Sequence, residues 1–284
     1  MLLKPFTFHT PNSLESALQA YGSLQDVKLQ AGGTFLLNSL KTMKRKGAKT
    51  PQNIISLAHI PELKGIANQG EYLLVKSMTN IDEIYNSPLL TDNAAVLRVA
   101  AKNISSQLIR NMATVGGNLT CRYTWTEMPA VMIALQARMH FIGVDGKEEI
   151  VPAEDFFKNA AKTDKIFTHV SIKKDRDVSF AYFRAKKTPY VDIPLLSLCI
   201  TTRFVKGNFS QTIVAVNNCV AFAQRDRKLE EFLNGNNSLD KTLAETALEH
   251  LDGSIYDARS TDYKKHMFRV GIGRALRDLV LCQT

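Results

Sequence analysis

The residues best suited to chemistry are two adjacent glycines, Gly32 and Gly33, in the stretch LQAGGTFLLNSLK. An apolar alternation over 27–31 predicts a strand before them, and the pattern of 35–44 predicts a helix after them. A glycine turn between a strand and a helix leaves backbone N–H groups free to bind an anion, and Thr34 can cap the helix or donate its hydroxyl to a phosphate. The stretch is neither G-x-G-x-x-G nor a Walker A sequence, so taken alone it favours an ordinary turn.

A second glycine pair, Gly116 and Gly117, follows another short apolar stretch in RNMATVGGNLT. Side chains that can form hydrogen bonds flank it at Thr114, Asn118 and Thr120. Each pair by itself is compatible with a bulge or a turn. Two such loops in one chain predict a site that holds both ends of an extended ligand with a pyrophosphate in its middle.

These motifs resemble those of the FAD-binding subunits, or FAD domains, of the molybdenum hydroxylases, such as xanthine dehydrogenase and carbon monoxide dehydrogenase. The first loop, AGGTFL at 31–36, matches the family's A-G-G-T/H-x-L, and 109–118 match its I-R-N-x-A-T-x-G-G-N. Shorter matches lie at 60–66 (IPELKGI), 144–157 (VDGKEEIVPAEDFF) and 260–276 (STDYKKHMFRVGIGRAL). The resemblance therefore extends over nearly the whole chain.

The resemblance implies that the chain binds FAD non-covalently. Backbone N–H groups of 29–36 would hold the pyrophosphate and the ribityl chain, and the second loop would hold the opposite side of the dinucleotide. A carboxylate at Glu127 would accept hydrogen bonds from a ribose hydroxyl or an amino group, and Arg184 would lie near the flavin or a phosphate. Asp192 matches a family Asp shortly after that arginine. The complete set of implied cofactor-binding residues is Leu29, Gln30, Ala31, Gly32, Gly33, Thr34, Phe35, Leu36, Ile104, Thr114, Gly117, Asn118, Glu127, Phe167 and Arg184.

Several positions depart from the family pattern or have a simpler explanation. Leu108 replaces a frequent Gln, Lys165 stands where Glu is common, and 121–129 lack the small residues and proline of relatives. Glu127 replaces an Asp, and it also suits a negative charge at the start of a helix. Arg184 is equally compatible with a surface ion pair, and the single tryptophan, Trp125, fits a packing or interface role better than stacking on a cofactor.

Composition excludes several other classes of protein. The 284 residues are 45% hydrophobic, which is enough for a substantial core, and no apolar run is long enough to span a membrane. The start of the chain lacks the apolar segment of a signal peptide, so we expect a cytoplasmic protein. The net charge of +9 comes from dispersed Lys and Arg without a nucleic-acid-binding motif, so we expect no nucleic acid partner. The four cysteines lie far apart and the six histidines show no ligand spacing, so no metal or iron–sulfur site is expected on this chain.

The hydrophobic patterns predict an α+β fold. Residues 1–58 form a small βαβ lobe, in which Asn12 caps a helix ended by Gly22, and 53–57 form another strand. Residues 59–175 form a second lobe, so 1–175 make a two-lobed FAD-binding domain, PCMH-type by resemblance, with the cofactor between the lobes. Residues 176–284 form a smaller C-terminal domain of antiparallel sheet plus helices, of the carbon monoxide dehydrogenase flavoprotein type by resemblance. Its strands are expected at 178–186, 194–204 and 209–218, followed by a helix with Leu239, Leu243, Ala247 and Leu251 on one face.

The function implied by the resemblance is electron transfer within a larger complex. A molybdopterin subunit would oxidise the substrate, and a [2Fe–2S] subunit would pass the electrons to FAD on this chain, which passes them to an acceptor. No catalytic residue is assigned, because no nucleophile–base arrangement is visible in the sequence. Two alternatives remain open from the residues alone: a free-standing FAD oxidoreductase, and a non-enzymatic scaffold that has lost its flavin.

Overall fold

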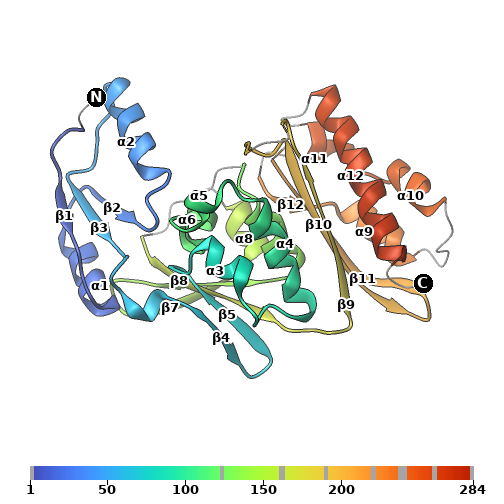
Figure 1. Cartoon of the computed structure of the whole chain (residues 1–284), viewed down its shortest axis with the longest axis horizontal. Coiled ribbons are helices and arrows are strands. Elements are labelled where there is room, and N and C mark those ends of the chain that lie inside the picture. Colours follow the sequence, from blue (N-terminus) through green and yellow to red (C-terminus); the bar gives the residue numbers. More distant parts are fainter. Residues whose placement is uncertain are drawn as a thin grey trace.

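The chain folds around three β-sheets that follow one another along the sequence (Figure 1). The computed structural model describes residues 3–121, 125–159, 164–188, 191–218, 222–235, 242–257 and 261–281. The elements within 7–56 form the N-terminal lobe, and those within 61–173 form the middle lobe. The elements within 178–281 form the C-terminal part. Among the described residues, we find no helix whose length and hydropathy would suit a bilayer span.

The N-terminal lobe is a parallel three-stranded sheet in the order β1-β3-β2, as the predicted βαβ unit requires. Its elements are β1 (Thr7–His9), α1 (Leu14–Ser23), β2 (Val27–Gln30), α2 (Leu36–Arg45) and β3 (Asn53–Ser56). The register places Leu29 beside Ile55, and both helices connect parallel strands. The apolar side chains of α1 and β2 share a small core with Ile142 and Ile166 of the middle lobe.

The caps of the first helix differ from the prediction. Ser13 rather than Asn12 is the N-cap, because its hydroxyl accepts the Ser16 N–H at 3.1 Å while the Ser16 hydroxyl accepts the Ser13 N–H at 3.2 Å. Gly22 lies inside the helix, and the chain leaves the helix through an extended Leu24 with φ −92°. Both predicted caps are therefore wrong, although the helix lies where its apolar stripe predicted it.

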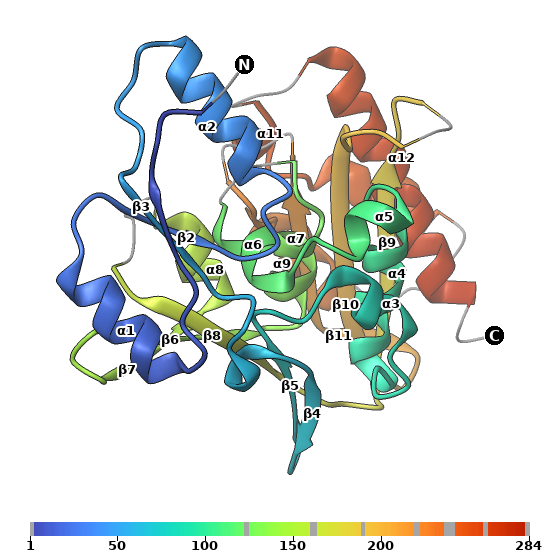
Figure 2. The ribbon, with the colours of Figure 1, turned by 60° about the vertical axis from the view of Figure 1, so that its left-hand side comes forward.

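The middle lobe is a five-stranded antiparallel sheet in the order β4-β5-β8-β6-β7, with helices packed on one face (Figures 1 and 2). Its main core contains Leu73 and Val75 of the sheet and every residue of α7 except its proline. Its elements are η1 (Pro61–Leu63), β4 (Ile66–Gln69), β5 (Tyr72–Lys76), α3 (Ile81–Asn86), η2 (Asp92–Ala95), α4 (Val96–Asn103), α5 (Gln107–Arg110), α6 (Val115–Thr120), α7 (Met128–Ala134), β6 (Arg138–Ile142), β7 (Glu148–Pro152), α8 (Ala153–Lys158) and β8 (Ile166–Lys173).

The C-terminal part is an antiparallel sheet in the order β12-β11-β10-β9, in agreement with the predicted antiparallel sheet plus helices. Helix α12 lies on the outer face of β9 and β10, and α9 packs on β11 (Figure 1). Leu239 lies outside the described residues, and the remainder of the single helix predicted there folds as two short helices, α10 and η3. The elements are β9 (Val178–Ala185), β10 (Leu196–Val205), β11 (Asn208–Asn217), β12 (Gln224–Arg225), α9 (Arg227–Gly235), α10 (Leu243–Thr246), η3 (Ala247–Glu249), α11 (Gly253–Asp257) and α12 (Asp262–Leu281).

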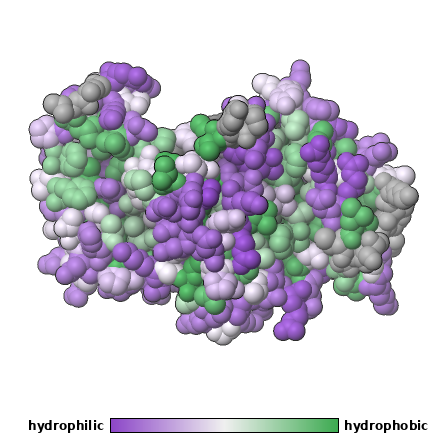
Figure 3. Space-filling model, in the orientation of Figure 1, coloured by the Kyte–Doolittle hydropathy of each residue, from purple (hydrophilic) through white to green (hydrophobic). Residues whose placement is uncertain are grey.

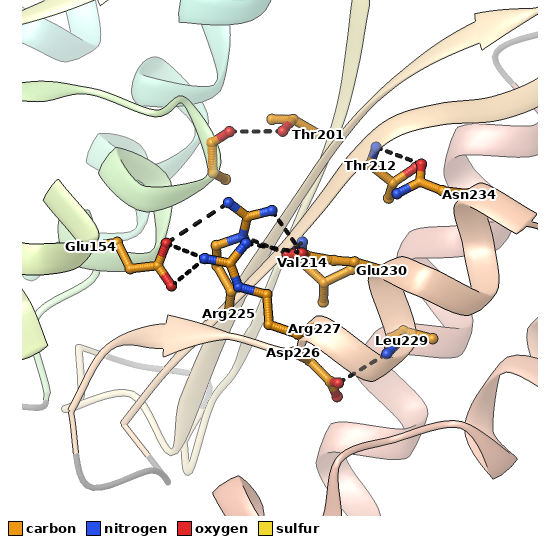
Figure 4. Close-up of polar contacts among 11 residues, drawn as sticks. Glu154, Thr201, Thr212, Val214, Arg225, Asp226, Arg227, Leu229, Glu230 and Asn234 are labelled. Carbon is orange, nitrogen blue, oxygen red and sulfur yellow. Dashed lines mark hydrogen bonds and ion pairs between the residues drawn. The ribbon is translucent and has the colours of Figure 1, made fainter. Parts of the chain in front are cut away.

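Helix α7 joins the middle lobe to the C-terminal sheet, because all of its residues are buried and it contacts both β10 and β11. Cys199 and Ala215 of those strands belong to the same core as α7. Hydrogen bonds reinforce the contact: the Thr201 hydroxyl donates to the Ala134 carbonyl at 2.8 Å, as Figure 4 shows, and the Asn217 amide donates to the Thr126 carbonyl at 2.6 Å. The inner face of the C-terminal sheet is thus continuous with the core of the middle lobe.

A cluster of charged residues fastens β12 and α9 to α8 (Figure 4). Arg225 holds the buried Glu230 through two hydrogen bonds of 2.8 and 2.7 Å, and one oxygen of Glu230 also accepts the Val214 N–H at 2.9 Å. The exposed Arg227 holds Glu154 of α8 through bonds of 2.8 and 2.7 Å. The Arg225 pair is bidentate through Nε and Nη2 and its carboxylate is buried, whereas Arg227 reaches both Glu154 oxygens through Nη2 alone and is exposed.

We expect these two arginines to differ sharply in their contribution to stability. Arg225→Met keeps most of the side-chain stem but leaves the Glu230 carboxylate buried with little compensation, so it should lower the free energy of unfolding by about 3–5 kcal/mol. Arg227→Met removes an ion pair whose arginine side chain is 59% exposed, and should cost less than about 1 kcal/mol. Urea unfolding of both variants measures the difference, and equal losses would contradict this assignment.

Candidate functional site

The two glycine loops lie against each other. A Cβ atom added to Gly32 would lie 1.9 Å from the Met112 carbonyl oxygen, and one added to Gly117 would lie 3.7 Å from the Ala31 Cβ. The backbone of the first loop therefore packs directly on the backbone of the second, and Gly32 is required for that close approach. Residues 31–33 and 112–117, far apart in sequence, form one surface.

The first loop offers unused hydrogen-bond donors. It connects β2 to α2, and Gly33 adopts a left-handed φ of +71° that suits glycine. Within the described part of the chain, the backbone N–H groups of Gly32, Gly33 and Thr34 donate no hydrogen bond. Thr34 does not cap α2, whose N-cap is Phe35 without a side-chain cap bond. Three open donors at the N-terminal end of a ten-residue helix make a favourable anion site.

The second loop differs, because its backbone donors are already satisfied. The N–H groups of Val115, Gly116 and Gly117 donate to the Thr79 carbonyl at 3.0 Å, the Ser77 carbonyl at 2.7 Å and the Thr114 hydroxyl at 3.1 Å. The glycine at 116 is needed for packing, since an added Cβ would lie 2.7 Å from the Ser77 carbonyl oxygen. The backbone of the second loop therefore supports the first loop, and its N–H groups at 115–117 are not open to a ligand.

One side chain of the second loop remains available. The Asn118 side-chain oxygen is buried and has no hydrogen-bond partner in the structure. A buried acceptor without a partner costs about 1–3 kcal/mol relative to a satisfied one. Asn118 also follows directly after Gly117, which contacts Ala31 of the first loop. A ligand that donates a hydrogen bond here would remove this cost.

The arginine of the Ile-Arg-Asn motif has a structural role. The Arg110 guanidinium lies 3.3 Å from the Asp82 carboxylate, donates to the carbonyls of Ile104 and Ser105 at 3.3 and 3.4 Å, and lies 5.6 Å from the centre of the Tyr85 ring. These contacts fix the turn that leads into the second loop. They also hold Ile104, one of the implied cofactor residues, whose side chain is almost completely buried.

An aromatic contact links the first loop to the segment before α7. The rings of Phe35 and Trp125 lie 5.8 Å apart between centroids, at an interplanar angle of 54°. The packing role that the sequence favoured for Trp125 agrees with this contact. It places the segment leading to Glu127 beside the start of α2.

Glu127 and Arg184 pair with each other across the boundary between the middle lobe and the C-terminal sheet. The Arg184 Nε donates to the Glu127 carboxylate at 3.1 Å, and its Nη2 donates to both the carboxylate and the carbonyl of Asp192 at 2.8 Å. The three side chains are at most 8% exposed. Burial raises the pKa of Glu127 to about 7, although the Arg184 charge opposes the shift. A ligand would reach either side chain only where this buried pair opens.

Phe167 is a core residue at an irregular point of the sheet. The pairing of β6 with β8 shifts by one residue between His140 and Phe141, and the Thr168 hydroxyl donates to the His140 carbonyl at 3.1 Å. The Phe167 ring lies 5.2 Å from the Phe141 ring and is 6% exposed. The structure thus brings Ala31 to Gly117 and Glu127 to Arg184, and buries Ile104 and Phe167 in the main core of the middle lobe.

The sequence reasoning missed the segment 77–80, which holds the second loop in place. The carbonyls of Ser77 and Thr79 accept the first N–H groups of α6, and the buried Ser77 hydroxyl has no partner. A capping box, with the Glu83 N–H donated to Asn80 at 2.7 Å and the Asn80 N–H donated to Glu83 at 2.9 Å, starts α3 there. The spacing of Asn and Glu by three residues was the available signal.

A surface pocket of the C-terminal part lies elsewhere and includes none of the implied cofactor residues. Its lining residues are Lys228, Glu231, Phe232, Gly235, Glu249, His250 and Leu251. The chemistry singled out by the sequence is therefore at the paired glycine loops and not in this pocket.

Comparison with known proteins agrees with the two-loop site. Over 158 residues the chain is 34% identical to the carbon monoxide dehydrogenase medium chain of Hydrogenophaga pseudoflava. This match covers 55% of this chain and 53% of that relative, so the chain spans about half the length of the relative. It is 28% identical over 254 residues to the nicotine 6-hydroxylase medium subunit of Paenarthrobacter nicotinovorans, covering 88% of this chain and 87% of that one.

The fold is also that of a solved structure. A chain of the carbon monoxide dehydrogenase from Hydrogenophaga pseudoflava that lacks the Mo-pyranopterin moiety of its molybdenum cofactor superimposes with a TM-score of 0.86, at 26% identity and with 98% of both chains covered. The expected fold class, an FAD-binding domain followed by a sheet-plus-helix part, is confirmed.

The family model described as the FAD binding domain in molybdopterin dehydrogenase matches residues 4–173. This range contains both glycine loops and the open donors between β2 and α2. The resemblance seen in the motifs is confirmed, and with it the FAD cofactor. The chain belongs to the family of FAD-binding domains found in molybdopterin dehydrogenases.

Proposed function

We propose that this chain is the flavin subunit of a cytoplasmic molybdopterin-dependent hydroxylase or dehydrogenase of the xanthine or carbon monoxide dehydrogenase type. It passes electrons from [2Fe–2S] clusters on a partner chain, through FAD, to an acceptor. Residues 1–175, with lobes 1–58 and 59–175, form the FAD-binding domain, and 176–284 form the C-terminal domain. The observation that carries the proposal is the first loop, whose three N–H groups donate no hydrogen bond to any described residue.

The residues present fit FAD. The N–H groups of Gly32, Gly33 and Thr34 suit the pyrophosphate, since they combine with the N-terminal end of α2 into one electropositive surface. The buried Asn118 oxygen suits a donor group of the same ligand, because the protein leaves it without a partner. When bound, FAD accepts two electrons and releases them one or two at a time.

The remaining implied residues form the wall of the proposed site. Ile104 and Phe167 contribute apolar surface, and the buried pair of Glu127 and Arg184 ties this wall to the C-terminal sheet. Thr114 sets the position of Gly117 through its cap bond. We assign no catalytic residue to this chain. Its own contribution is to hold, orient and desolvate the cofactor, and substrate oxidation belongs to the molybdopterin partner.

The acceptor role of Asn118 is tested by Asn118→Leu, which has a similar volume. We expect FAD to bind about tenfold more weakly, since one hydrogen bond to the ligand is lost. The flavin-free chain should unfold at the same or a higher urea concentration, because the buried oxygen without a partner is removed. Titration with FAD and urea unfolding give the two values. Unchanged affinity would contradict the contact, whatever the stability.

The role of Gly33 is tested by comparison with Gly70, which also has a left-handed backbone conformation. Gly33→Ala and Gly70→Ala both place a side chain on a left-handed backbone, at φ +71° and +57°, so each should lose about 1–2 kcal/mol of stability. Only Gly33 lies in the proposed cradle, so only its variant should bind FAD at least about tenfold more weakly. If both variants bind FAD as tightly as the parent chain, the cradle is wrongly placed.

The subunit role is tested by reduction of the isolated chain. After verification that it contains FAD but neither iron nor molybdenum, dithionite should bleach the flavin absorbance, whereas a purine, an aldehyde, an N-heteroaromatic compound or carbon monoxide should not. The native complex isolated through a tag on this chain should contain iron and molybdenum. Reduction of the isolated chain by such a substrate at a catalytic rate would instead support a free-standing flavoenzyme.

A further inference from the structure

Exposed apolar side chains gather on the two segments that build the cradle. Among the described residues they are Phe35 (38% exposed), Leu37 (48%), Leu108 (78%), Ile109 (38%) and Met112 (57%), here called the loop patch. Soluble proteins rarely expose groups of large apolar residues without a binding role, and methionine and aromatic residues are enriched at protein interfaces. Leu108, which departs from the family pattern, is the most exposed of the five.

The loop patch borders the cofactor site. Phe35 and Leu37 lie at the start of α2, and the other three lie on α5 or just after it. These two segments meet where Gly32 contacts the Met112 carbonyl. Figure 3 shows an apolar spot over α5 against more polar surroundings. A protein that covers this patch would therefore lie next to the first loop.

The two sequence segments that carry the loop patch contain no acidic residue, although Asp82 of α3 pairs with Arg110 of α5 at 3.3 Å. Residues 27–61 contain six Lys or Arg and no Asp or Glu, and 93–126 contain four Lys or Arg and no Asp or Glu. Lys41 and Arg45 of α2 and Lys102 of α4 are exposed in the structure. The apolar patch thus lies on two segments that carry only positive charge, which suits an acidic partner surface.

We propose that the loop patch is the docking surface of the partner chain that carries the [2Fe–2S] clusters, with Leu108 as its apolar anchor and the surrounding Lys and Arg residues facing an acidic surface of that partner. This rests on the proposed function, since an electron donor must approach the flavin closely and the patch is an apolar surface that adjoins the cradle. Of the other occupants, a second copy of this chain fits poorly. A two-fold contact would bring the same positive segments together.

The test compares two exposed apolar positions in the native complex. Leu108→Asp places a negative charge against the proposed acidic partner, and Val205→Asp introduces the same charge outside the loop patch, at a site 55% exposed on the β10–β11 hairpin. The complex is isolated through a tag on this chain, and iron and acid-labile sulfide are measured per FAD. We expect the Leu108 variant to keep FAD but to bind the iron-containing chain at least about thirtyfold more weakly. The Val205 variant should match the parent.

Three results decide the proposal. Unchanged iron per FAD and unchanged affinity in Leu108→Asp would overturn it, as would a loop-patch-dependent dimer or vesicle binding of the parent chain. If the aspartate variant loses FAD as well, Leu108→Ser decides, with the same expected loss of iron. A parent chain that holds FAD but brings no iron would count against the proposed function itself, and so separates the two failures.

Discussion

The architecture of the site depends on one close approach, where the Gly32 backbone lies against the Met112 carbonyl with no room for a Cβ atom. This contact forces the start of α2 onto the turn after α5, so two segments about eighty residues apart share one surface. The second loop can bear this contact because the N–H groups of Val115 and Gly116 donate to carbonyls of 77–79 and Arg110 fixes the turn before the loop. A ligand at the first loop would therefore bind to a surface that the packing of the two loops has already formed.

Helix α7 and buried ion pairs connect the region of the site to the C-terminal sheet. Helix α7 starts at Met128, just after the Trp125–Phe35 contact and the N-cap Glu127, and runs into the core shared with β10 and β11. Charges buried at this boundary are paired: Glu127 and Asp192 with Arg184, and Glu230 with Arg225. Buried pairs of this kind add little net stability over apolar packing, yet each is expensive to break. Glu127 with Arg184 is the pair among these that joins the middle lobe to the C-terminal sheet, so it helps to specify how the sheet sits on that lobe.

Local signals in the sequence predicted much of this fold. The apolar stripe of α1, the strands at 27–31 and 53–57 and the three long C-terminal strands all lie close to where periodicity placed them. The cap at Ser13 was missed because Asn12 and Ser13 are both good caps, and only backbone geometry selects between them. The pairing of Glu127 with Arg184 joins residues 57 positions apart, a distance at which local patterns carry no information.

The two glycine pairs have similar sequences but differ in how their backbone N–H groups are hydrogen-bonded in the structure. Both read as Gly-Gly beside a threonine after a short apolar stretch, and both suggested an anion cradle. In the structure, the threonine of the second pair caps α6 and its backbone donors are filled, whereas Thr34 caps nothing and the donors of the first pair stay open. The difference arises from the neighbours: 77–79 supply carbonyls to the second loop, and no described segment supplies them to the first. Since the closed loop is rigid and the open loop packs on it, FAD binding need not order either loop. More of the energy of its phosphate contacts can then appear as affinity.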